Sequence, residues 1–209
     1  MIIDHTHEEY LKIWDALGAD RYNGAWYYSQ EIVQNIIPRV RTRRNWVTVN
    51  IPGRACDNSI VFIHNNGHPE VYKWLKHYNN LVLVCGTPES ADTMSYIAPS
   101  LYLPLSVDVK YVLQFAAPKQ KKVCFAGRLS KLQDINEKVD ILSGMPRPDL
   151  LEKMARYEMV YAVGRTAIEA KILGCKVLPY DPRYPDPDMW QVIDNSEAAV
   201  MLQKALDER

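Results

Sequence analysis

The sequence predicts an α/β protein in which short strands of parallel sheets alternate with helices. Short β-branched or apolar runs, of the kind that form buried strands, recur over residues 45–181. Amphipathic segments that open with typical helix-start residues separate these runs, which is the pattern of strands joined by crossover helices. With 209 residues, 47% of them hydrophobic, the chain is long enough for one generous core or two small ones.

The first domain is predicted to span residues 1–110 and to begin with helices. Apolar residues at three- and four-residue intervals indicate an amphipathic helix that ends near Gly18, and Ser29 is expected to cap a second helix. The segments 69–78 and 88–97 each open with proline and glutamate and are predicted helices. Strands are expected over 45–51, 59–64, 80–86 and 100–105.

A change of composition marks the predicted domain boundary. Residues 111–122 contain a proline, a pair of small residues and a cluster of lysines between two sets of strand-like runs, and we interpret them as the linker. The second domain is therefore placed at 123–209. Its strands are expected over 122–127, 139–144, 159–164 and 176–181, and its helices over 146–157, 165–174 and from about 188 to 206.

The charge balance excludes a general electrostatic role. Lys plus Arg and Asp plus Glu each number 25, so the formal net charge is zero and gives no basis for wrapping duplex nucleic acid or coating a membrane. One basic run precedes the first predicted strand and consists of Arg39, Arg41, Arg43 and Arg44. This run could contact nucleic acid or an anionic acceptor, but a solvated edge leading into the strand is the simpler interpretation.

Targeting, metal-binding and disulfide patterns are weak in this sequence. The amino terminus lacks the basic start and apolar core of a signal peptide, and no window approaches the ~18 apolar residues of a membrane span, so we expect a cytoplasmic protein. His5 and His7 have a metal-like spacing but are interpreted as a solvated helix start, so no metal is expected. The cysteines never form a Cys-x-x-Cys pair and are expected to be reduced, buried thiols: Cys56, Cys85, Cys124 and Cys175.

The stretch VYAVGRTAIEAKILGCKVLPYD, residues 160–181, places a glycine, an arginine and a hydroxyl between a predicted strand and a predicted helix. In an open parallel sheet, ligands bind beyond the carboxyl ends of the strands, where a helix offers backbone amides and the positive end of its dipole. Gly164 would let the backbone approach an anion, and Arg165 and Thr166 would bind phosphate oxygens. Glu169, one helical turn further, could accept hydrogen bonds from a ribose diol. The stretch therefore predicts a site for a phosphate flanked by a sugar.

The same residues also allow an interpretation without a ligand. Thr-x-x-Glu is a capping box as well, in which Thr166 and Glu169 satisfy backbone donors at the start of the helix. A second strand end favours the ligand interpretation, because KVCFAGRLSK places Gly127, Arg128 and Lys131 just beyond the first strand of the same domain. Loops at the ends of neighbouring strands can face one ligand.

On these motifs, residues 121–209 resemble the nucleotide-binding domain of two-domain glycosyltransferases of the GT-B type. The shared pattern is a strand ending in Gly-Arg with a lysine a few residues later, a segment such as MPRPDLLEKMARYEMVYAVG, and a helix that carries Glu-Ala and ends in glycine before the strand KVLPYD. The order of these elements is the specific part of the pattern, since each short motif alone is common. The resemblance implies two small Rossmann-like domains whose parallel sheets face across a cleft.

The resemblance also implies how the donor would be bound. The donor would be a nucleotide sugar, a co-substrate that requires no further cofactor, whose diphosphate would contact Arg128 and Lys131 and whose ribose would contact Glu169. Transfer would be metal-independent, because cationic side chains and a helix amino terminus would stabilise the departing diphosphate. Many retaining members of the family carry a second glutamate eight positions before the ribose-binding one. This chain has Tyr161 at that position, so one part of the family's donor site is missing or relocated.

The acceptor would dock on the first domain. There His64 follows a predicted strand and is the candidate for proton transfer, and Asn65 and Asn66 are the candidates for acceptor contact. A purely structural role is the alternative for this histidine. The glycine-rich loop that often follows the first strand in the family is reduced here to PGRACDN, with Gly53.

Two functions are therefore expected, one enzymatic and one not. The first is a glycosyltransferase of hexosyltransferase type that moves a sugar from a nucleotide to an acceptor. The alternative is a non-catalytic protein of the same fold that binds or sequesters a nucleotide or a nucleotide sugar. The sequence leaves open the base, the sugar, the acceptor, the stereochemical outcome and the oligomeric state.

Overall fold

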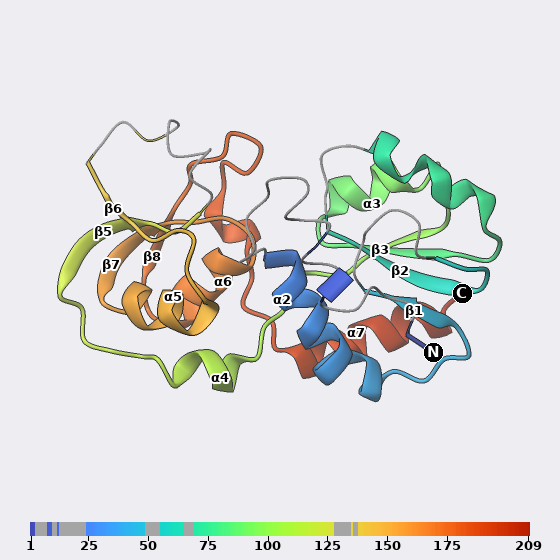
Figure 1. The fold of residues 1–209 in the computed structure, drawn as a ribbon, viewed down its shortest axis with the longest axis horizontal. Helices are drawn as coiled ribbons and strands as arrows, with labels where there is room; N and C mark the ends of the chain where they lie inside the picture. Colours follow the sequence, from blue (N-terminus) through green and yellow to red (C-terminus); the bar gives the residue numbers. More distant parts are fainter. Residues whose placement is uncertain are drawn as a thin grey trace. The chain divides into compact units, whose positions relative to one another are not determined.

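The computed structural model of the chain divides into two compact units, each with its own parallel sheet (Figure 1). It describes residues 1–2, 8–9, 12, 24–48, 55–64, 69–127, 135 and 138–209. Unit 1 comprises Met1–Pro104 and Ser196–Arg209, and unit 2 comprises Leu105–Asn195. The predicted α/β class with parallel sheets is confirmed.

Unit 1 is built on a four-stranded sheet in the order β1-β2-β3-β4, with neighbouring strands parallel. Its strands are β1 Asn45–Val47, β2 Ser59–Ile63, β3 Val82–Cys85 and β4 Ser100–Tyr102. Every residue of β2 and β3 is buried, as expected for apolar runs in a sheet that is covered on both faces. A strand therefore lies within each of the four runs predicted for this half, although residues 49–51 of the first run lie outside the described residues.

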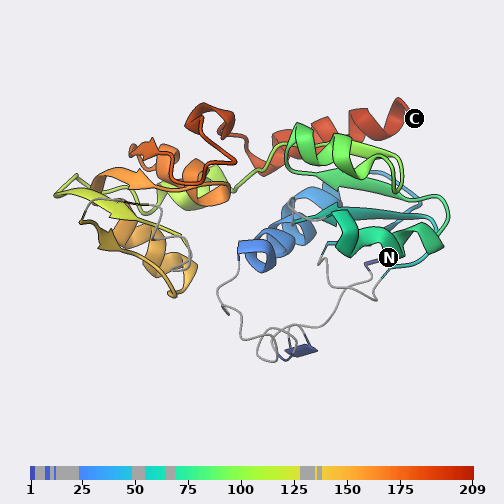
Figure 2. The same cartoon turned by 90° about the horizontal axis from the view of Figure 1, so that it is seen from above.

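Helices cover both faces of the unit 1 sheet. The helical elements, in which η marks π- and 3-10 helices, are α2 Gly24–Glu31, η1 Ile32–Ile36, η2 Ile37–Arg39, η3 Pro69–His77, α3 Pro88–Met94 and α7 Asn195–Asp207. Figure 1 shows η3 and α3 on one face and α2 and α7 on the other. Because η3 and α3 each join adjacent strands of a sequential sheet, right-handed connections place both on the same face. Figures 1 and 2 both draw α7 beside the elements of unit 1.

The helix around Ser29 begins earlier than the sequence predicts. α2 starts at Gly24, so Ser29 lies inside the helix and is not its N-cap. The Ser29 hydroxyl donates to the carbonyl oxygen of Trp26 at 2.6 Å, a bond to the preceding turn that serine makes inside helices. The predicted Ser29 cap is wrong because the aromatic stretch before it, with Tyr28 only 4% exposed, packs as part of the helix. The helix predicted to end near Gly18, together with His5 and His7, lies largely outside the described residues.

Unit 2 is built on a second four-stranded parallel sheet, in the order β6-β5-β7-β8. Its elements are α4 Val109–Leu113, β5 Lys121–Phe125, β6 Asp140–Ile141, α5 Arg147–Met154, β7 Tyr157–Tyr161, α6 Arg165–Ile172, β8 Lys176–Leu178 and η5 Pro187–Met189. α5 and α6 pack against β7 and against each other. The core between them includes Leu151, Val160 and Ile168, all of which are at most 1% exposed.

The boundaries of the two units differ from the predicted linker. The segment 111–122 holds most of α4 and the start of β5, so it belongs to unit 2. The chain instead passes between the units at residues 104–105 and again at 195–196. The closing helix also begins later than position 188, because residues around Asp194 are extended and pair with Val107. The two backbone bonds of this pairing are Val107 N to Ile193 O and Asn195 N to Val107 O, both 3.1 Å.

The cysteines are free thiols, as predicted. Three of them are buried and Cys56 is half-buried. Burial raises the pKa of Cys85 to about 11 and that of Cys124 to about 12, so these thiols stay protonated at neutral pH. In the described parts of the chain, no helix is both long and apolar enough to cross a membrane.

Lys119 joins the ends of two helices in unit 2. Its ammonium group donates to the carbonyl oxygens of Ala155 at 2.9 Å and Leu173 at 2.7 Å, and it lies 3.1 Å from the Cys175 sulfur. Ala155 and Leu173 are the C-caps of α5 and α6. A cation at this position satisfies terminal carbonyl groups and matches the negative ends of both helix dipoles.

We expect Lys119→Met to lower the free energy of unfolding by about 1–3 kcal/mol, because buried carbonyl groups would lose a charged donor. The midpoint of the urea transition measures this change. Lys122→Met is the matched control, since Lys122 is exposed, and its effect should stay within about 0.5 kcal/mol. Equal effects of the two substitutions would contradict the role of Lys119.

Candidate functional site

The candidate site lies where the strand order of unit 2 reverses. β5 and β7 are neighbours at the centre of the sheet although β6 lies between them in the sequence. Their carboxyl ends are in register, with Phe125 opposite Tyr161, and the amide of Ala126 donates to the carbonyl oxygen of Tyr161 at 3.0 Å. The chain leaves β5 toward one edge of the sheet and β7 toward the other, which opens the crevice where open α/β sheets bind ligands. Gly127 and Gly164 follow these two strand ends.

Gly164 has a backbone conformation that other residues avoid. Its φ is 62° and its ψ is −139°, and it is the N-cap of α6, without a side-chain cap. Its carbonyl oxygen accepts from the amides of Ala167 at 3.0 Å and Ile168 at 3.2 Å. Thr166 is the second residue of the helix, so the capping-box interpretation with Thr166 at the N-cap is wrong. The backbone instead turns sharply at a residue without a side chain, directly at the mouth of the helix.

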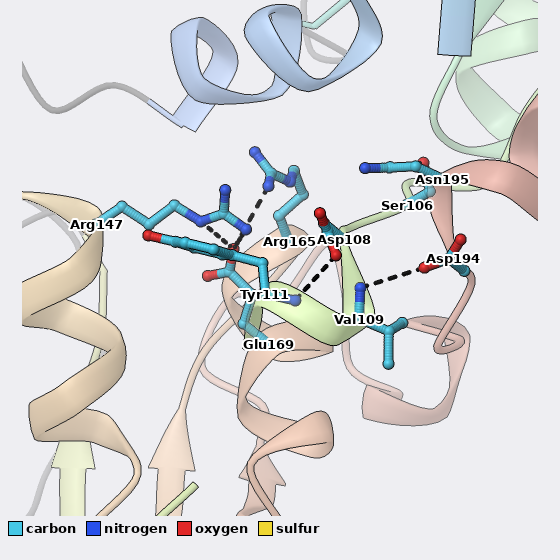
Figure 3. A network of polar contacts seen from close by, with 9 residues as sticks. All are labelled: Ser106, Asp108, Val109, Tyr111, Arg147, Arg165, Glu169, Asp194 and Asn195. Carbon is cyan, nitrogen blue, oxygen red and sulfur yellow. Dashed lines mark hydrogen bonds and ion pairs between the residues drawn. The ribbon is translucent and has the colours of Figure 1, made fainter. Parts of the chain in front are cut away.

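Glu169 is at the centre of a buried cluster of charges (Figure 3). The Nε and Nη2 atoms of Arg147 each lie 2.8 Å from Glu169 Oε1, and Nη2 of Arg165 lies 3.5 Å from the same oxygen. The side chains of Arg147, Arg165 and Glu169 are 12%, 10% and 5% exposed. The structure thus gives Glu169 two cationic neighbours, of which the sequence analysis identified only Arg165 as part of the site.

Both arginines lie at helix positions where a positive charge is unfavourable. Arg147 is the first residue of α5 and Arg165 the first residue of α6, where the positive end of a helix dipole disfavours a cation. Their placement is therefore not explained by helix stability, and the Glu169 carboxylate offsets the unfavourable charge. Sequence reasoning could place Arg147 at a helix start, since prolines flank it, but no local pattern reveals a partner 22 residues away.

A third strand end approaches the same region from β8. The ring of Tyr180 meets the ring of Phe125 edge to face, with centroids 5.0 Å apart. A Cβ atom at Gly127 would lie 2.9 Å from the Tyr180 hydroxyl and 2.8 Å from Phe125 Cζ, so any larger residue would require one of these rings to shift. Asp181 is 3% exposed and accepts from Arg183 through Nε at 3.0 Å and Nη2 at 2.6 Å. Beside it lies a hollow of about 440 Å³, lined by Pro179, Tyr180, Asp181, Pro182 and Pro185.

Another hollow, of about 570 Å³, lies near the opposite ends of the strands. There Tyr157 donates to Asp140 Oδ2 at 2.7 Å, and the Lys121 ammonium lies 3.1 Å from the same oxygen. The hydrogen bonds from Tyr157 and Lys121 lower the pKa of Asp140, and burial raises the pKa of Tyr157. At neutral pH Tyr157 is thus a neutral donor paired with a carboxylate. Because Lys121 and Tyr157 start their strands, this hollow is at the end of the sheet that ligands usually avoid.

Several predicted site residues lie outside the described part of the chain. They are Arg128 and Lys131 on the donor side, Asn65 and Asn66 on the acceptor side, and Gly53. Their roles stay predictions. Of the remaining candidates, the structure brings Gly127 to the switch point and places Gly164, Arg165, Thr166 and Glu169 at the start of α6.

His64, in unit 1, has structural neighbours. Its Nε2 atom bonds the carbonyl oxygen of Thr48, and its ring meets the ring of Tyr28 edge to face, with centroids 5.7 Å apart. Because a carbonyl only accepts, Nε2 must carry the proton in this arrangement. These contacts favour the structural interpretation, and the catalytic role of His64 stays a prediction.

The basic run before β1 also makes local contacts. Arg39 Nη1 donates to the carbonyl oxygen of Asn35, and Arg44 Nη1 donates to that of Asn80. The Arg41 amide donates to the side chain of Gln203, in α7, at 2.6 Å. These contacts favour a structural role for the basic run at the edge of unit 1. They do not favour a surface for nucleic acid.

The comparisons with protein-family models and with curated proteins returned no match to this chain. The function is therefore inferred from the geometry of the site.

We expect Gly164→Ala to lower the free energy of unfolding by about 1–3 kcal/mol, because alanine is strained at this φ and ψ. Space is available, since the nearest atom to an added Cβ is Leu105 Cδ1 at 3.7 Å. Any decrease in the free energy of unfolding measured with urea must then come from backbone strain. Gly164→Asn should be no better than alanine, because this ψ lies outside the left-handed region that asparagine tolerates. Wild-type stability of both variants would show that residues other than glycine are not strained at position 164.

We expect Glu169→Gln to lower the free energy of unfolding by about 3–5 kcal/mol, because two buried guanidinium groups would lose their carboxylate. Glu152→Gln is the matched control. Glu152 forms an exposed pair with Arg156 at 3.6 Å, and breaking such a pair should cost less than about 1 kcal/mol. Urea unfolding of the two variants gives both values, and a Glu169→Gln effect as small as the control would show that the buried charges are compensated elsewhere.

Proposed function

We propose that unit 2 binds the nucleotide part of a nucleotide sugar and that the protein is a metal-independent glycosyltransferase. The observation that carries the proposal is the meeting of Gly127 and Gly164 at the topological switch point, with Glu169 one turn into the adjoining helix. In open parallel sheets this position is where phosphates and ribose are bound. The two units would correspond to the two Rossmann-like domains of the GT-B type, and the acceptor would dock on unit 1.

The diphosphate would lie against the start of α6. The turn at Gly164 leaves room for a phosphate close to the backbone, and α6 directs the positive end of its dipole to that point. Arg165 and Thr166 lie in the first turn and would supply a guanidinium and a hydroxyl. Arg128 and Lys131, after β5, would contact the same diphosphate from the neighbouring strand end.

The ribose would contact Glu169. A carboxylate accepts hydrogen bonds from both hydroxyl groups of a diol, and Glu169 lies one helical turn beyond the proposed phosphate position. Glu169 is 3% exposed, so a ribose would reach it only after neighbouring side chains move. The hollow beside Tyr180 would then be available for the base or the sugar.

Transfer would depend on stabilising the leaving group. An acceptor hydroxyl would attack the anomeric carbon, the bond from that carbon to the diphosphate oxygen would break, and the hydroxyl proton would pass to a base. The negative charge that develops on the diphosphate would be stabilised by fixed cations and the helix amino terminus. His64 is the proposed base, although its Nε2 atom bonds the Thr48 carbonyl in the structure.

The alternative is a binding protein with the same site and no transfer. The contacts of His64 with Thr48 and Tyr28 favour this alternative, because they engage the one residue that the sequence predicts as the base. Slow hydrolysis of a nucleotide sugar in the absence of acceptor would support the enzyme. Stoichiometric binding without turnover would support the binding protein.

We expect a nucleoside diphosphate or nucleotide sugar to raise the thermal midpoint, because any ligand that prefers the folded state stabilises it. A screen of ADP, GDP, UDP and their sugar conjugates would identify the base. The shift should be smaller in Glu169→Ala, because the contact with the ribose is lost. If none of these compounds raises the midpoint at millimolar concentration, the nucleotide proposal is wrong.

We expect Arg128→Ala to weaken nucleoside diphosphate binding by at least about tenfold in calorimetry, because one charge-assisted phosphate contact is lost. Arg156→Ala is the control, since Arg156 is exposed and lies near the opposite end of the sheet. Unchanged affinity in Arg128→Ala would remove Arg128 from the site while leaving the site itself in place.

A further inference from the structure

We propose that Arg147 is a positioning residue that fixes the Glu169 carboxylate for recognition of ribose hydroxyls. This inference rests on the proposed function, because it specifies how the same site would distinguish a ribonucleotide from a deoxyribonucleotide. Arg147 lies within the segment MPRPDLLEKMARYEMVYAVG, which carries part of the family resemblance, but no role is implied for it there, and only the structure brings it to Glu169 (Figure 3).

The contacts on Glu169 are asymmetric. Arg147 Nε donates to Oε1, Arg147 Nη2 lies within ion-pair distance of the same oxygen without forming a hydrogen bond, and Arg165 Nη2 also donates to Oε1. Among the residues that the structure describes, no donor is recorded on Oε2. A carboxylate in a side chain only 5% exposed therefore has one oxygen occupied and one available as an acceptor. A ligand hydroxyl is the kind of donor that the second oxygen would accept.

Arg147 determines which way the carboxylate plane faces. The last torsion of a glutamate side chain is broad, so the carboxylate plane rotates easily when nothing holds it. Nε and Nη2 belong to one planar guanidinium group, and both lie 2.8 Å from the same oxygen. A lysine offers a single charged centre without this fixed geometry. The guanidinium therefore sets the direction of Oε2 as well as neutralising the charge.

The guanidinium group of Arg147 packs against Tyr111, a residue of α4. Its guanidinium carbon lies 5.2 Å from the centroid of the Tyr111 ring, within cation–π range. Tyr111 is fixed in turn, because its amide donates to Asp108 Oδ1 at 2.9 Å, and the Val109 amide donates to Asp194 Oδ2 at 3.3 Å. Figure 3 shows this row of side chains leading from Asp194 to Glu169. Such support from surrounding residues is what keeps a binding group in place before the ligand arrives.

Loss of Arg147 should affect the contact with the sugar and not the contact with the diphosphate. The diphosphate would contact the start of α6 and the loop after β5, whereas the ribose hydroxyls would contact Glu169. Loss of Arg147 should then weaken binding of a ribonucleotide and leave binding of its dideoxy analogue nearly unchanged. A purely structural role of Arg147 would weaken both to the same extent.

The test measures the ratio of two dissociation constants by calorimetry. The probes are ADP, GDP and UDP, each paired with its 2′,3′-dideoxy analogue. We expect the wild-type protein to prefer the ribose form of one of them by at least about tenfold, the size of one or two good hydrogen bonds. In Arg147→Gln this preference should fall below about threefold while the dideoxy affinity changes by less than about twofold. Arg147→Lys should be intermediate, and the control Arg156→Gln should keep the wild-type ratio.

Each outcome decides the proposal. A folded Arg147→Gln variant with the wild-type ratio, or with equal loss of both affinities, overturns the positioning role. Should that variant fail to fold, Tyr111→Leu provides the same test, because it removes the aromatic contact and keeps both charges; an unchanged ratio in Tyr111→Leu and in Arg147→Lys then overturns the role. Wild-type binding without any ribose preference overturns the roles of Arg147 and Glu169 and leaves nucleotide binding standing. Absence of wild-type binding overturns the proposed function itself.

Discussion

The parallel pairing of β5 with β7 is the constraint on which the rest of unit 2 depends. These strands are neighbours although β6 lies between them in the chain, so the connections after them run to opposite edges of the sheet. In open parallel sheets the crevice between two such strand ends is where ligands bind. Gly127 and Gly164 follow the two strand ends. A side chain at Gly127 would displace the ring of Phe125 or Tyr180, and a side chain at Gly164 would be strained at its φ and ψ.

The buried charges around Glu169 lie beside this crevice. Two cations at the first positions of α5 and α6 are unfavourable for the helices themselves, and removing a carboxylate from water is also costly. The cluster joins α5 to α6, and a structural role of this kind is the simplest alternative to a ligand site. Both hydrogen bonds that the described residues make to the carboxylate end on Oε1, an arrangement that leaves Oε2 for a ligand hydroxyl. Buried charges beside a strand-end crevice are therefore consistent with binding.

The strands were the most predictable part of the fold. Their apolar and β-branched runs are local signals, and each of the eight runs overlaps a strand in the structure. Helix boundaries were less predictable, because Tyr28 packs as part of α2 and residues near Asp194 pair with Val107. The division into units was also missed, since the residues that join Ser196–Arg209 to unit 1 are distant in the sequence: the Arg209 guanidinium bonds the carbonyl oxygen of Ser100, and Gln203 pairs with the backbone of Arg41.

The sequence by itself determined the class of the fold and the strand-to-helix turn at Gly164, because both follow from short-range periodicity and from residue types with narrow conformational preferences. Only the tertiary structure decided which strand ends are neighbours and which charges meet. Strand order depends on pairing across the sheet, and the contact between Arg147 and Glu169 spans 22 residues. Such contacts form only after the helices pack on the same face of the sheet, and no local pattern records them.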